Sequence, residues 1–264
     1  MPDGSSNSPP APSCKSFARR LWRRIFALWK FKALLTLAIT TLFCIPYFLL
    51  GNFPIFPVHD LPSTWIDRKI GFHPYAWVWI YQSLYPLLNA LPWLADRRAD
   101  LLRYAKGFAL LSIVCFTVYA VFPTRSPKPM VEHARGMYAV LRWYDTPLNA
   151  LPSLHAGLCV YTLAFGWRLF RGKLPAWLGA LFVAWGGLIL YGTLATKEHY
   201  LVDIVSGALI AIIADAIVWH GHFSDHDSPQ PYTPSKNPRP RHTPDHADTK
   251  IRDSSGRISQ AGRK

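Results

Sequence analysis

Two histidines stand at the beginnings of apolar runs that lie far apart in the sequence. His155 follows Pro152-Ser153-Leu154, and His199 precedes Asp203 by four residues. Four residues make about one helical turn, so we expect the Asp203 carboxylate to accept the proton on one imidazole nitrogen of His199. That contact leaves the other nitrogen as a nucleophile, by the orienting logic of a catalytic triad.

The chemistry that these histidines could supply is phosphoryl transfer. A histidine that attacks phosphorus forms a covalent phosphohistidine, and His155 could protonate the leaving oxygen and deprotonate the incoming one. Ser153 is typical of a helix N-cap, and the N–H groups of the first turn that follows suit a phosphate. Four basic side chains close to these points are also predicted to bind phosphate: Arg125, Lys128, Arg142 and Lys197.

The apolar runs that carry these residues predict an integral membrane protein. The composition is 50% hydrophobic and includes 11 tryptophans. A spanning helix needs about 20 mostly apolar residues. A soluble protein with buried helices is disfavoured by so many runs. We predict an all-α fold with six transmembrane helices, at residues 33–50, 74–94, 104–122, 154–170, 174–194 and 200–219.

The formal net charge of +14 could indicate a nucleic-acid partner, but the positions of the charges favour a membrane. With the N-terminus in the cytoplasm, the inner segments hold 14 Lys and Arg residues and the outer segments hold 7, before the basic tail is counted. This asymmetry follows the positive-inside rule. We therefore expect a multi-pass protein of the plasma (inner) membrane, with cytoplasmic termini, no nucleic-acid partner, and both histidines at the extracytoplasmic face.

The chain divides into four predicted segments. Residues 1–14 and 221–264 are predicted to be disordered, the second as a cytoplasmic tail, because both are polar and rich in proline or serine. Residues 15–32 are predicted to form a basic amphipathic helix on the membrane surface, and residues 33–219 the six-span catalytic domain. The 4 cysteines show no metal-ligand spacing, so no metal or cofactor is expected.

The two histidine segments together resemble the second and third signatures of the type 2 phosphatidic acid phosphatase superfamily. These segments are Pro152-Ser153-Leu154-His155 and His199-Tyr200-Leu201-Val202-Asp203. The Ser-Leu-His form is similar to the inositol-phosphorylceramide-synthase-like branch. The resemblance covers about residues 74–219. It implies a helical core like that of phosphatidic acid phosphatases and haloperoxidases, and metal-independent transfer with His199 as nucleophile, Asp203 as its partner and His155 as acid and base.

Two positions differ from the superfamily's usual pattern. The third signature often has Ser-Arg before the nucleophile, where this chain has Gly192 and Thr193, so Lys197 is expected to replace that arginine. The first signature usually has a lysine upstream of Arg-Pro, and no lysine occupies that place before Arg125.

These observations predict a membrane lipid phosphatase that hydrolyses a lipid phosphate. A phosphotransferase that moves a phospho-head-group to a polyol or lipid acceptor is the alternative, with Arg142-Trp143-Tyr144-Asp145 as the best candidate for an acceptor site. A proton-coupled transporter is a further alternative. It is disfavoured because the polar residues stand at helix starts, whereas transporter sites usually lie near the midplane. Asp215, near the inner end of its run, is expected to be structural.

Overall fold

The structure is a computed structural model that describes residues 14–126, 128–145, 148–171 and 175–220. These residues belong to one structural unit, Met1–Gly221. The predicted disordered segments lie outside the described residues, except for Cys14, which begins the first helix.

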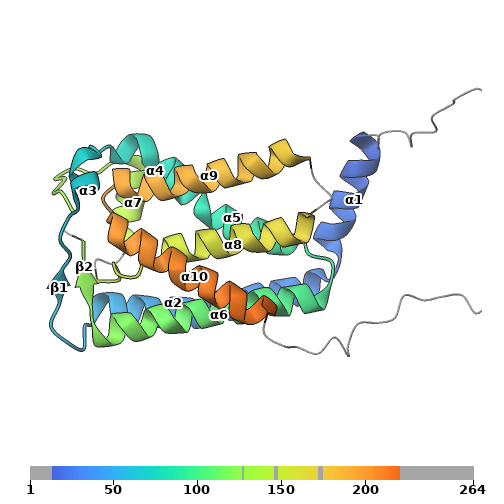
Figure 1. The fold of residues 1–264 in the computed structure, drawn as a ribbon, viewed down its shortest axis with the longest axis horizontal. Coiled ribbons are helices and arrows are strands. Elements are labelled where there is room, and N and C mark those ends of the chain that lie inside the picture. Colours follow the sequence, from blue (N-terminus) through green and yellow to red (C-terminus); the bar gives the residue numbers. More distant parts are fainter. Residues whose placement is uncertain (1–13, 127, 146–147, 172–174, 221–264) are drawn as a thin grey trace, which may run out of the picture. The chain divides into compact units, whose positions relative to one another are not determined.

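Long helices that run side by side make up most of the described part (Figure 1). Strand β1 pairs in parallel with β2, and both lie with α3 and α7 at one end of the bundle (Figure 1). Along the chain the elements are α1 (Cys14–Phe26), α2 (Trp29–Asn52), β1 (His59–Asp60), α3 (Trp65–Lys69), α4 (Pro74–Gln82), α5 (Leu84–Trp93), α6 (Arg98–Val121), β2 (Thr124–Arg125), α7 (Gly136–Tyr144), α8 (Leu154–Phe170), α9 (Ala176–Ala195) and α10 (Leu201–His220).

Four of the described helices are long and apolar enough to cross a membrane, namely α2, α6, α9 and α10. The run 74–94, predicted as one span, is instead divided between α4 and α5 at Ser83. Pro86 explains the break, because it has no N–H to donate to the carbonyl of Gln82. The run 154–170 forms α8, which has 17 residues. A helical protein with several candidate spans is therefore confirmed, while the number six stays a prediction.

The basic segment 15–32, predicted as one surface helix, is interrupted in the structure. Helix α1 ends at Phe26, and Leu28 adopts a left-handed backbone conformation with φ of 57°. Residues 29–32 belong to α2 instead. Trp22 and Phe26 are exposed and stack on each other, as expected of a helix whose aromatic face meets a membrane surface.

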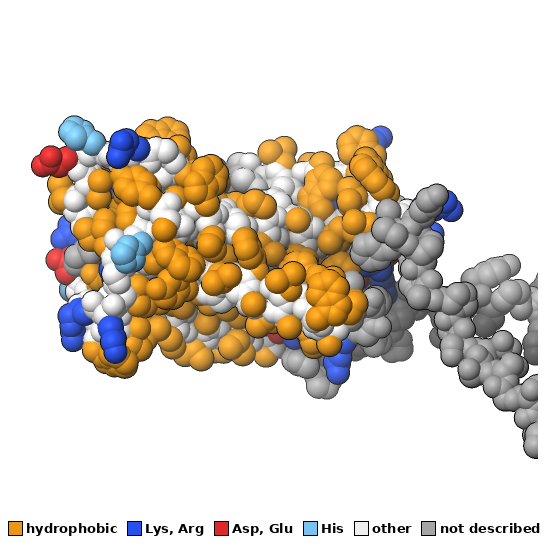
Figure 2. Space-filling view, turned by 90° about the horizontal axis from the view of Figure 1, so that it is seen from above, with side chains coloured by type: hydrophobic (Ala, Val, Ile, Leu, Met, Phe, Trp, Pro, Cys, Tyr) orange, Lys and Arg blue, Asp and Glu red, His pale blue; other side chains and the backbone are white. Residues whose placement is uncertain are grey.

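Apolar side chains cover the flank of the bundle, whereas charged side chains gather toward its two ends (Figure 2). On α2, for example, Leu34, Leu37 and Leu42 are each about two-thirds exposed or more. Soluble proteins rarely expose apolar patches of this extent. The flank therefore has the surface of a protein that is surrounded by lipid.

Helices α8 and α10 approach each other closely at Gly157 and Gly207. A Cβ added at Gly207 would lie 2.0 Å from the Ser153 carbonyl oxygen, and one at Gly157 would lie 3.0 Å from the Gly207 carbonyl oxygen. The close approach lets the Ser153 N–H donate to the Asp203 carbonyl at 2.9 Å. The glycines thereby place the beginnings of the two helices, and the predicted catalytic residues on them, next to each other.

The opposite ends of α8 and α10 are joined by an ion pair. Arg168 contacts both carboxylate oxygens of Asp215 at 2.5 Å, and its guanidinium also lies over the Trp219 ring. A structural role for Asp215, as the sequence suggested, agrees with this contact.

Replacing Gly207 with alanine is expected to destabilise the protein by about 1–3 kcal/mol, because the new methyl group would overlap the Ser153 carbonyl. The matched control is Gly187→Ala on α9, where an added Cβ meets nothing within 4 Å. The control should be neutral or slightly stabilising, because alanine favours a helix. Thermal unfolding of both variants in detergent is the measurement. Equal melting temperatures would contradict the proposed importance of the α8–α10 contact.

Candidate active site

The two predicted catalytic histidines meet at the end of the bundle that carries the strands. His155 Nδ1 lies 3.0 Å from His199 Nε2. The exposed fractions are 9% for His155 and 4% for His199. Two segments that are 44 residues apart in the sequence therefore form one buried imidazole pair. The expectation that both histidines lie at the same face of the bundle agrees with this geometry.

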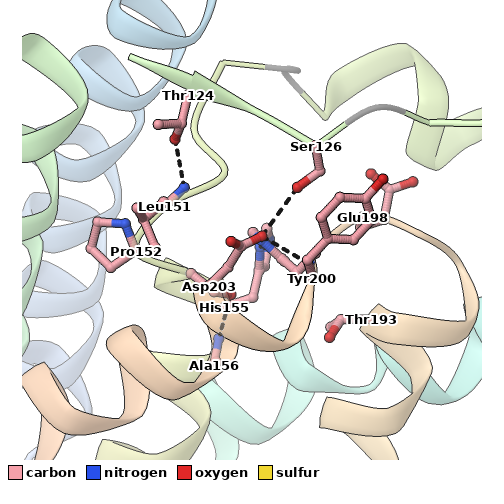
Figure 3. Close-up of polar contacts among 12 residues, drawn as sticks. Thr124, Ser126, Leu151, Pro152, His155, Ala156, Thr193, Glu198, Tyr200 and Asp203 are labelled. Atoms are coloured by element: carbon pink, nitrogen blue, oxygen red, sulfur yellow. Dashed lines mark hydrogen bonds and ion pairs between the residues drawn. The ribbon is translucent and has the colours of Figure 1, made fainter. Parts of the chain in front are cut away.

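Asp203 lies on the other side of His199, although the two residues do not share one helix. His199 precedes α10, while Asp203 occupies its first turn. The distance from His199 Nδ1 to Asp203 Oδ2 is 3.5 Å, and the same oxygen accepts hydrogen bonds from the Tyr200 N–H at 2.8 Å and the Ser126 hydroxyl at 3.1 Å (Figure 3). The carboxylate thus caps α10 and faces the imidazole with its negative charge. The backbone from His199 to Asp203 therefore forms a capping turn, and not the helical turn that was predicted from the sequence.

Ser153 is the N-cap of α8, as the sequence predicted. Its hydroxyl accepts a hydrogen bond from the Ala156 N–H at 3.1 Å. The segment before it is fixed by the Thr124 hydroxyl, which accepts from the Leu151 N–H (Figure 3). The Tyr119 hydroxyl also donates to the Pro152 carbonyl. These contacts set the position of the helix start from which His155 projects.

A buried group of charges lies beside the histidines. The Lys128 ammonium donates to Asp145 at 3.1 Å and also contacts Glu198, and the Tyr47 hydroxyl donates to Asp145 at 2.8 Å. The side chain of Lys128 is 10% exposed and that of Glu198 is fully buried. These residues line a small polar cavity together with the histidine pair, and its lining comprises Tyr47, Lys128, Asp145, Asn149, Ala150, His155, Glu198 and His199.

Two carboxylates share one ammonium in this group, so their ionisation differs. Burial raises the pKa of Glu198. The positive charge of Lys128 opposes that rise, and the negative charge of Asp145 adds to it. Burial also opposes ionisation of Asp145, but Lys128 and other neighbours lower its pKa below the usual value. Glu198 therefore keeps its proton to a higher pH than an exposed glutamate, and Asp145 is the ionised partner of Lys128.

The three other predicted phosphate-binding cations do not line this cavity. Arg125 is half-exposed and pairs with Asp60 on β1 at 2.8 Å. The Lys197 ammonium donates to the carbonyl groups of Asp67 and Ile70, where it caps the end of α3. Arg142 is exposed on α7. Of the four basic residues selected from the sequence, the structure brings Lys128 alone to the histidine pair.

A family model described as the PAP2 superfamily matches residues 55–217, which include both histidine segments and most of the helices described above. The chain belongs to the PAP2 superfamily. No curated protein matches the chain, and no solved structure matches it. The superfamily generally comprises phosphatases, and membership together with the apolar helices indicates a membrane protein with phosphatase-type or phosphotransferase-type activity. The resemblance seen in the sequence is thus confirmed for the superfamily, while the inositol-phosphorylceramide-synthase-like branch stays a prediction.

Several residues of this PAP2 site were not selected from the sequence. The Tyr85 hydroxyl lies 3.2 Å from His155 Nε2 and 3.3 Å from the Tyr144 hydroxyl. Tyr85 and Tyr47 gave no signal, because each is one aromatic residue within an apolar run. Glu198 could have been found from its place next to His199. Asp145, by contrast, belongs to the segment that the sequence predicted as an acceptor site. Ser126 could have been found from strand alternation, because it and Thr124 point inward on either side of Arg125.

Removing the ammonium of Lys128 by Lys128→Met is expected to destabilise the protein by about 3–5 kcal/mol, because Asp145 loses its buried counter-charge and Glu198 loses a hydrogen-bond donor. Arg142→Met is the control, since Arg142 is exposed and should change stability little. Melting temperatures in detergent measure both effects. If Lys128→Met and Arg142→Met have the same melting temperature, this charge group does not support the fold.

Proposed function

We propose that this PAP2 protein is a membrane lipid phosphatase that hydrolyses a lipid phosphate through a phosphohistidine at His199. The observation that carries the proposal is the contact between His155 and His199, with the Asp203 carboxylate behind the second imidazole. A nucleophile, an acid–base group and an orienting carboxylate are the parts that covalent catalysis at phosphorus requires.

In the proposed first step, the Nε2 lone pair of His199 attacks phosphorus. The N–P bond forms as the P–O bond to the lipid breaks, and protonated His155 gives its proton to the lipid oxygen, which leaves as an alcohol. In the second step, water attacks phosphorus, His155 accepts a proton from that water, and the N–P bond breaks to release phosphate. Asp203 stabilises the positive charge that develops on His199.

Lys128 is the proposed binding group for the phosphate oxygens, because it lies in the same cavity as the histidines. The N-terminal end of α8, capped by Ser153, adds positive potential there. We propose that these groups stabilise the charge of the transition state without a metal ion or cofactor. A protonated Glu198 keeps the second negative charge away from the incoming phosphate.

The proposed membrane arrangement has six crossings, with α4 and α5 together forming one crossing and α8 another. Both termini are proposed to face the cytoplasm and the histidine pair the extracytoplasmic side. The charge asymmetry of 14 to 7 supports this orientation. So does the position of the site, at the end of the bundle that carries β1, β2, α3 and α7, opposite α1 (Figure 1).

A phosphotransferase is the second candidate, and Asp145 is the observation that favours it. This carboxylate and the Tyr47 hydroxyl lie in the cavity that His155 lines, where they could bind the hydroxyl groups of a polyol. The test is the partition of a labelled lipid phosphate between free phosphate and an alcohol adduct as inositol or glycerol is increased. If the labelled product shifts saturably from free phosphate to the adduct, and Asp145→Ala loses this shift while it still hydrolyses the lipid phosphate, the protein is a phosphotransferase and not a phosphatase.

Rapid quenching with labelled lipid phosphate is expected to trap an acid-labile, base-stable adduct on the wild-type protein. His199→Ala should form no adduct. Asp203→Asn should keep the fold but lose most of the rate, because the negative charge beside His199 is removed while hydrogen-bond acceptance from Tyr200 and Ser126 can persist. Adduct on the His199→Ala protein would assign the nucleophile elsewhere.

A chelator should leave turnover intact, and loss of turnover that one divalent ion restores would refute the metal-free mechanism.

The pH dependence of kcat/KM should show an alkaline decline that comes from Glu198. The pKa of this acid is raised, so it is neutral below that pKa and becomes negative above it, where it repels phosphate. Glu198→Gln cannot ionise and should extend the active range to higher pH. Glu132→Gln, at an exposed site, is the control and should retain the wild-type profile. An unchanged alkaline decline in Glu198→Gln would assign that decline to another group.

Single cysteines at Arg135 and Arg97, in a background without the native cysteines, should react with a membrane-impermeant reagent from opposite sides. Both positions are exposed, and they lie before α7 and before α6, at opposite ends of the bundle. Arg135→Cys is expected to react in intact cells, and Arg97→Cys only after the membrane is opened. The reverse result would place the histidine pair on the cytoplasmic side.

A further inference from the structure

A long apolar cavity begins at His155 and extends along α2 and α5. Its volume is about 420 Å³, within the range of pockets that bind small molecules. Helix α2 forms one wall, with residues spaced three or four apart from Lys32 through Ile39 to Tyr47, and α5, α6 and α8 form the others. His155 lines both this cavity and the small polar cavity at the reaction centre.

We infer that this cavity holds one hydrocarbon chain of the substrate lipid and that its closed end sets the longest chain that fits. The inference rests on the proposed lipid phosphatase function. A lipid phosphate has its reactive group at one end of an apolar chain. The cavity presents the matching arrangement, with His155 and Tyr85 at one end and apolar side chains beyond them.

The length of the cavity suits a long hydrocarbon chain. Lys32 and Tyr47 are 15 positions apart on α2, which corresponds to about 22 Å along the helix axis. One leaflet of a bilayer contributes about 15 Å of hydrocarbon, so the cavity is deeper than one leaflet.

The far end of the cavity is closed by contacts between α2 and α5. The Lys32 ammonium, which is buried, donates to the Trp93 carbonyl at 2.7 Å and to the Arg24 carbonyl at 2.7 Å. The Trp93 indole N–H donates to the Thr36 hydroxyl at 3.3 Å. A chain that enters past His155 therefore meets a polar, hydrogen-bonded wall at the level of Trp93. Methylene groups beyond this point gain no burial.

The test compares kcat/KM for single-chain alkyl monophosphates of about 8 to about 20 carbons in mixed micelles. For the wild type, kcat/KM should rise with chain length by up to about fourfold per buried methylene and then reach a plateau. Ile39→Trp fills the cavity about halfway along α2 and should bring the plateau to shorter chains, lowering kcat/KM for the longest chains at least about tenfold. Its activity on the shortest chain should remain, which also shows that the variant is folded.

Leu37→Trp is the matched control, because Leu37 lies at nearly the same depth of α2 but is 65% exposed on the flank. It should keep the wild-type plateau. Trp93→Leu removes the indole that closes the cavity and should extend the plateau to longer chains. Identical chain-length profiles for the wild type and Ile39→Trp, with phosphate still released, would overturn the chain cavity and leave the phosphatase proposal standing. Failure of the wild type to release phosphate from any chain would overturn both.

Discussion

The active-site geometry depends on the backbone contact between the beginnings of α8 and α10. The Ser153 N–H donates to the Asp203 carbonyl, and Gly207 has no side chain to hold the two helices apart. One histidine belongs to α8, the other immediately precedes α10, and Asp203 is in the first turn of α10. A separation of even one ångström at this crossing would break the 3.0 Å contact between the imidazoles, since neither side chain is long enough to compensate. Backbone packing in the apolar part of the bundle therefore sets the distances on which phosphoryl transfer would depend.

The second constraint is electrostatic. Lys128 is buried beside the histidines, where its proposed role is to bind phosphate, and burying an ammonium alone costs several kcal/mol. Asp145 offsets that cost as the ionised partner of Lys128, but a second ionised carboxylate would leave the group negative and hostile to phosphate. Retention of a proton on Glu198 resolves this conflict, because a neutral carboxyl still hydrogen-bonds and adds no charge. The group is thus neutral before phosphate binds, and Lys128 is held in place without being surrounded by excess negative charge.

The sequence indicated the two histidines and Asp203 better than the residues that surround them. His155, His199 and Asp203 could be found because short polar motifs at the starts of apolar runs are costly unless they have a function. The four predicted phosphate-binding cations were less certain, because distance along the chain does not report side-chain direction. On its extended strand, Arg125 points outward to Asp60, while its neighbours Thr124 and Ser126 point inward. The break between α4 and α5 has a visible cause in Pro86, although the run 74–94 is uncharged throughout and long enough for one span. Tyr85 had no such signal, since its role depends on a tertiary contact with His155.

Helix α2 links the reaction centre to the apolar interior. In the sequence, its apolar run indicates only a membrane-spanning helix and no part in a functional site. In the structure it packs against α6, supplies the Tyr47 hydroxyl to Asp145 at one end, and fixes Lys32 to α5 at the other. Between these two polar attachments it forms a wall of the cavity that His155 also lines. The attachments hold α2 at both ends while leaving an apolar space between it and α5, so the same helix that orients a charged group at the site can also determine which hydrocarbon chain reaches it.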